Sequence, residues 1–60
     1  MTIQEFMEQE RPEIEKEGFA IDCVWVKDVK GNYITTPGTT EIICVNVDKY
    51  NTTADITFIV

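Results

Sequence analysis

The 60-residue chain contains no histidine, no serine and no leucine. Histidine is the commonest general base of enzymes, and serine is a frequent nucleophile. Without them, catalysis would depend on carboxylates, two thiols, two tyrosines and a few lysines. We therefore expect a non-enzymatic protein with no catalytic residues.

Cysteine is scarce as well, with only Cys23 and Cys44. They form no CxxC pair, and a zinc site built from them would lack its histidine ligands. We predict no metal site and no cofactor. Alternation along the strands predicts that both side chains are small buried apolar groups on opposite sides of the sheet, which excludes a disulfide between them.

Long apolar runs are also missing, and no stretch approaches the ~18 residues that a membrane span requires. The acidic start, MTIQEFMEQE, lacks the basic and apolar segments of a secretory signal. We expect no membrane contact and a cytoplasmic location, where thiols stay reduced.

Positive charge is in short supply, since five basic residues face eleven acidic ones and the net charge is −6. Such a chain is repelled by phosphate backbones and by anionic membrane surfaces. Direct binding of nucleic acid is therefore not expected. A partner with a basic protein surface fits this charge better.

The chain is rich in β-branched residues, because Ile, Val and Thr supply 22 of its 60 positions. These residues favour strands. Sixty residues suffice for one small domain, residues 1–60, whose core is of marginal size. The composition therefore predicts a single domain with a substantial sheet.

A helix is predicted at the N-terminus, from a capping box at Thr2 and Glu5 to a left-handed C′ residue at Gly18. An apolar stripe at helical spacing would face the core: Ile3, Phe6, Met7 and Ile14. Pro12 interrupts the pattern, because proline removes a hydrogen bond inside a helix and crowds the preceding turn. We predict a kink or break near Pro12.

Beyond Gly18 the apolar period changes to two, which is typical of strands. The predicted strands are residues 19–27, 32–36, 41–47 and 54–60, and turns at residues 28–31, 35–40 and 48–53 separate them. The prediction is an α+β fold in which the helix packs on one face of a small antiparallel sheet of about four strands, made of two hairpins.

One helix cannot cover both faces of such a sheet, so the second face is expected to be partly apolar and to mediate contacts. The residues assigned to self-association are Val24, Val26, Ile42 and Ile59. Trp25 is placed in the core, and strand 54–60 is placed at an edge. A homodimer follows, and a structural or oligomerisation domain is the alternative function.

The negative charge is concentrated in the helix, where residues 1–17 carry −4 of the net −6. Its Glu residues either keep a small protein soluble or imitate the phosphates of a nucleic acid. The second interpretation leads to our main hypothesis, a protein-binding module of the kind used as inhibitors by phages and mobile elements. The predicted contact residues are Glu5, Glu8, Glu13 and Glu15.

Overall fold

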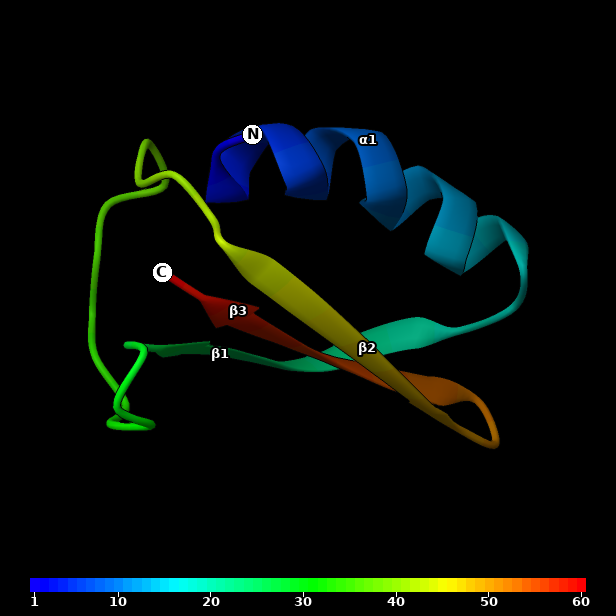
Figure 1. Cartoon of the computed structure of the whole chain (residues 1–60). Helices are drawn as coiled ribbons and strands as arrows, with labels where there is room; N and C mark the ends of the chain where they lie inside the picture. The colour runs from blue at the N-terminus through cyan, green and yellow to red at the C-terminus, as the bar shows by residue number, and fades with distance from the viewer.

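The computed structural model describes all 60 residues as one helix over a three-stranded sheet (Figure 1). The elements are α1 (Ile3–Lys16), β1 (Ala20–Lys27), β2 (Cys44–Tyr50) and β3 (Thr53–Ile59). The predicted α+β class is confirmed. The prediction of four antiparallel strands is wrong, because the sheet has three strands and is mixed.

Both ends of α1 follow from local sequence. The Thr2 hydroxyl accepts from the Glu5 N–H at 3.1 Å, and the Glu5 carboxylate accepts from the Thr2 N–H at 2.8 Å. At the other end Gly18 has a φ of 99°, and the N–H of Phe19 reaches the carbonyl of Ile14. These bonds make the predicted capping box and Schellman ending.

Pro12 lies inside α1, which continues through it without a break. The predicted break is therefore wrong. Pro12 lies about 160° around the helix from the buried Ile14, so its ring is on the solvent side. A helix that loses a hydrogen bond on its solvent side can bend gently around the core instead of ending.

The sheet order is β1-β3-β2, so the last strand is in the centre. It runs parallel to β1 and antiparallel to β2. The prediction that residues 54–60 form an edge is therefore wrong. The apolar alternation of β3 explains its place, because a central strand buries its inward side chains most completely. Ala54, Ile56 and Phe58 have no exposed surface.

A β-bulge interrupts β1 between Ile21 and Cys23 and leaves Asp22 without a partner in β3. Ile21 pairs with Ala54 before the bulge, and Val24 pairs with Ile56 after it. The residues that face the helix therefore change from odd to even numbers at this point. The predicted alternation assumed an uninterrupted strand and was wrong beyond Asp22.

Residues 28–43 form a long connection, which makes an isolated bridge from Tyr33 to Lys27 in place of the predicted strand 32–36 and a second one from Glu41 to Thr2. The connection then runs to the start of α1 (Figure 1). Gly38 and Thr40 accept hydrogen bonds from the N–H groups of Gln4 and Ile3. These bonds fix the connection at the helix and take it away from β1.

The core lies between α1 and the sheet. Its four buried residues are Ile14, Ala54, Ile56 and Phe58. Phe6 meets Phe58 edge to face with ring centroids 5.4 Å apart. Partly buried side chains complete it: Ile3, Phe6, Met7, Phe19, Ile21, Val26, Ile42, Val45 and Val47. This small core leaves the outward side of α1 and the other face of the sheet to solvent.

Candidate functional site

The outward side of α1 carries the predicted contact residues, and all four of them are exposed. Glu8 and Glu15 are about 20° apart around the helix, and Glu5 is about 60° from Glu8. Glu13 is about 140° from Glu8 and lies on the other flank. The structure thus brings Glu5, Glu8 and Glu15 onto one stripe, the acidic stripe, and leaves Glu13 outside it.

Arg11 is the basic residue beside the acidic stripe, about 60° from Glu8 and 40° from Glu15 around the helix, and it forms no salt bridge with them. The chain's salt bridges join Lys49 to Glu17 at 2.7 Å and the Met1 ammonium to Glu41 at 2.8 Å, and neither involves the stripe. Hydrogen bonds from Thr2 lower the pKa of Glu5 below its ordinary value, so this carboxylate is ionised at neutral pH. Glu8 accepts a hydrogen bond from the amide of Gln4. The stripe is therefore a negative surface available to a partner.

The helix that presents the stripe is fixed at its first turn. Besides the bonds that the carbonyls of Gly38 and Thr40 accept, the carbonyl of Met1 accepts from the N–H of Ile42 at 3.0 Å. The Met1 ammonium and Glu41 add an exposed ion pair beside this bond. The carboxylates of the stripe are thus held at set spacings by a helix that is anchored to the sheet.

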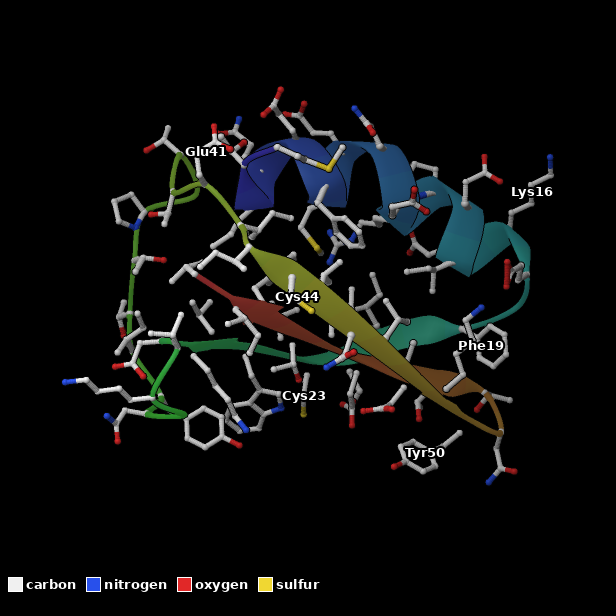
Figure 2. All side chains as sticks on the ribbon, viewed as in Figure 1. Lys16, Phe19, Cys23, Glu41, Cys44 and Tyr50 are labelled. Atoms are coloured by element: carbon white, nitrogen blue, oxygen red, sulfur yellow. The ribbon has the colours of Figure 1, made fainter.

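The sheet face away from α1, the open face, is mixed in character. It carries one row of residues from each strand: Cys23, Trp25 and Lys27 from β1, Thr53, Asp55, Thr57 and Ile59 from β3, and Cys44, Asn46, Asp48 and Tyr50 from β2. In Figure 2 the side chains of Cys23 and Tyr50 point away from the helix. Polar residues dominate the central strand, so the face is partly apolar as expected, but most of its apolar side chains are not the ones assigned to it.

Trp25 and Tyr33 form an aromatic pair beside β1, with ring centroids 5.3 Å apart. Lys27 places its ammonium 4.7 Å from the centre of the Tyr33 ring. Trp25 is 47% exposed, so its predicted place in the core is wrong. The bulge at Asp22 turned it to the open face.

A groove of about 410 Å³ runs along the pair. Its lining consists of Val24, Trp25, Val26, Tyr33, Ile34, Thr35 and Thr36. Tyr33 is the one titratable group among them, so the groove brings no acid and base together. The Thr36 hydroxyl is buried and has no hydrogen-bond partner. The groove offers apolar and aromatic contacts and does not assemble a catalytic pair.

The bulge also gathers Asp22, Cys23 and Asp55, whose possible ligand atoms lie within 4.8 Å of one another. Burial of the thiol, followed by the two neighbouring carboxylates, raises the pKa of Cys23 above its ordinary value. This thiol is therefore protonated at neutral pH, and a metal ion bound here would have to displace its proton.

The two cysteines do not lie as predicted. Cys23 pairs with Asp55 and Cys44 with Ile59, so both are on the open face, at its two outer strands. Cys44 is exposed and Cys23 is half-buried, so neither is a core residue. They are two strand spacings apart across the sheet, roughly 9.5 Å, and four residues apart along it, roughly 13 Å, which is too far for a disulfide. Both thiols are free for this reason.

The residues assigned to self-association do not share a surface. Val24 and Val26 face α1, where Val26 and Ile42 pack against the core. Ile59 is the one member of the set on the open face. The sequence interpretation missed Trp25 as a surface residue, and the signal that could have indicated the bulge was the charged Asp22 between apolar residues of the strand.

Comparison of the chain with protein families, with curated proteins and with solved structures gave no match. The helix lacks the length and the apolar character that crossing a membrane requires.

Proposed function

We propose that this chain is a non-enzymatic protein-binding module that docks on a positively charged protein surface through the acidic stripe. The observation that supports it is the stripe itself, in which Glu5, Glu8 and Glu15 are exposed and free of salt bridges. Glu13 adds charge on the neighbouring flank. Spaced carboxylates on a fixed helix complement a basic groove and accelerate encounter with it.

The specific role that this surface suits is inhibition of a nucleic-acid-binding protein. Phages and mobile elements use inhibitors of this kind. A nucleic-acid-binding protein has a basic groove for phosphates, and the stripe would occupy it. The chain itself would not bind nucleic acid, because its net charge of −6 repels phosphate. We place this role in the cytoplasm, where Cys23 and Cys44 remain free thiols.

The test uses a ten-residue arginine peptide as a basic probe. Amide signals of the ¹⁵N-labelled protein are followed by NMR as the peptide is added at low salt. We expect the largest shifts in α1, and we expect Glu8→Gln/Glu15→Gln to weaken binding roughly two- to twentyfold, as the loss of two exposed ion pairs would. Rising salt should weaken binding of the unmodified chain.

The matched control is Asp22→Asn/Asp48→Asn, which changes the net charge by the same two units away from α1. It should retain most of the affinity. Equal losses in the two variants, or shifts confined to the open face, would contradict a role for the acidic stripe. Adding Glu5→Gln and Glu13→Gln extends the test, since glutamine can replace glutamate in a capping box.

A further inference from the structure

The two outer strands of the sheet differ in how far their free edges are protected. β1 has a bulge at Asp22, and its end is covered by the connection, where Val26 accepts from the N–H of Ile34 and Asp28 donates to Asn32. Bulges and covering segments are devices that prevent pairing with another chain. The edge of β1 is therefore blocked.

The edge of β2 has no bulge and no covering segment, and its protective feature is the inward-facing Lys49, which forms an ion pair with Glu17. β2 pairs only with β3, in regular register over seven residue pairs, and contains no proline and no bulge. Its outer side faces the viewer in Figure 1 with no segment alongside it. Every second residue of such a strand directs its N–H and C=O groups outward, where another strand can bind them.

From this asymmetry we infer that two copies of the chain pair antiparallel through β2 and form a symmetric dimer with a continuous six-stranded sheet. A two-fold axis relates the two copies, so the same edge of each copy contacts the other. Because each copy has one open edge, the assembly closes at two chains and does not extend into a filament.

The charges of β2 select the register. We call the centre of the register the residue that lies opposite its own copy at the two-fold axis. With Val47 at the centre, all seven residues of β2 pair. Asn46 then lies opposite the partner's Asp48 and Tyr50 opposite the partner's Cys44, on the open face. Moving the centre to Asp48 would set two carboxylates opposite each other, which is destabilising. Moving it to Asn46 would leave only five strand residues paired. The centre at Val47 is favoured on both counts.

Cysteine substitution distinguishes the three registers. In a Cys23→Ser/Cys44→Ser background, single cysteines replace Asn46, Val47 or Asp48, and each variant is mildly oxidised. Residues opposite each other across paired strands are within disulfide reach. We expect a disulfide-linked dimer from Val47→Cys and little from the other two. A dominant product from Asn46→Cys or Asp48→Cys would overturn the proposed register.

A charge pair tests the same contact without cysteine. In the Asn46→Asp variant the new carboxylate would lie opposite the partner's Asp48, and the symmetry of the dimer repeats this pair of like charges. We therefore expect the dimer dissociation constant to rise roughly two- to thirtyfold. Asn46→Lys should lower it. Sedimentation equilibrium measures both, and circular dichroism checks that the variants fold. Equal effects of the two variants, or a monomer at all concentrations, would overturn the proposal.

The dimer does not depend on the acidic stripe, which lies on the other side of the core. Glu8→Gln/Glu15→Gln should therefore dimerise as well as the unmodified chain. If this variant binds the arginine peptide more weakly and remains dimeric, both proposals hold. Loss of dimerisation in the variant would contradict an interface confined to β2.

Discussion

Asp28 organises the turn that follows β1. Its carboxylate accepts hydrogen bonds from the backbone N–H groups of Lys30 at 2.9 Å and Asn32 at 3.0 Å. Gly31 closes the turn with a φ of 90°. These bonds, first of all the one from Asn32, hold the pKa of Asp28 below its ordinary value of 3.8. The charged carboxylate is therefore the form that stabilises the turn.

The lowered pKa of Asp28 determines how the stability of the protein depends on pH. A carboxylate with a lowered folded-state pKa contributes stability that is complete above its unfolded-state pKa and is lost as the pH falls through the folded-state value. We expect the unfolding temperature to fall below about pH 4. Asp28→Asn should show a smaller fall. Glu10→Gln is the control, because the exposed Glu10 carboxylate forms no ion pair, and an equal reduction there would contradict the assignment.

At the scale of single residues, much of the sequence interpretation depended on which residues of β1 face the helix. Ala54, Ile56 and Phe58 all face the core, as the period of two in the sequence requires, because β3 alternates without interruption. Trp25 and Cys23 were misplaced because one extra residue, Asp22, inverts the faces beyond it. A bulge forms through pairing with a distant strand, so local alternation could not reveal it.

Among the elements, α1 contains the clearest local defect. Pro12 cannot donate a hydrogen bond to the carbonyl of Glu8, and the helix continues around this gap. We predict that Pro12→Ala raises the free energy of unfolding by about 1 to 2 kcal/mol, after allowance for the greater freedom of the unfolded chain. Urea denaturation measures the change.

The control for this variant is Gln9→Ala, an exposed substitution in the same helix, which should change stability by less than about 0.5 kcal/mol. If Pro12→Ala leaves stability unchanged or lowers it, the restriction that proline places on the unfolded chain outweighs the missing bond. That result would assign Pro12 a stabilising role.

The limits of α1 were predictable because its caps are local. Thr2 and Glu5 interact three residues apart, and Gly18 acts within one turn. The predicted strand 32–36 failed for the opposite reason. The connection is bound to the start of α1 through Gly38 and Thr40, which are more than thirty residues away from their partners in sequence.

For the whole molecule, the sequence was sufficient for the α+β class and for the acidic helix, but not for the order of the strands. Apolar patterning assigns residues to strands without naming their neighbours. A hairpin between residues 19–27 and 32–36 was the simplest local pairing. The structure instead pairs β1 with β3, and this central position buries the inward side chains of β3 completely.

This pairing joins near and distant parts of the chain in one sheet. β2 and β3 are separated by only Asn51 and Thr52, where Asn51 takes the positive φ of 47° that asparagine tolerates. β1 meets β3 across a much longer separation, as when Ala20 pairs with Thr53. Closing the longer loop costs more chain entropy, so it should come later during folding.

The β2–β3 hairpin should therefore be formed in the folding transition state, with β1 docking afterwards. Val45→Ala, in the hairpin, should mainly slow refolding, whereas Ile21→Ala, in β1, should mainly accelerate unfolding. Stopped-flow chevron plots of the two variants measure these rates. The reverse pattern would mean that the parallel pair of strands nucleates folding and that the hairpin closes onto it.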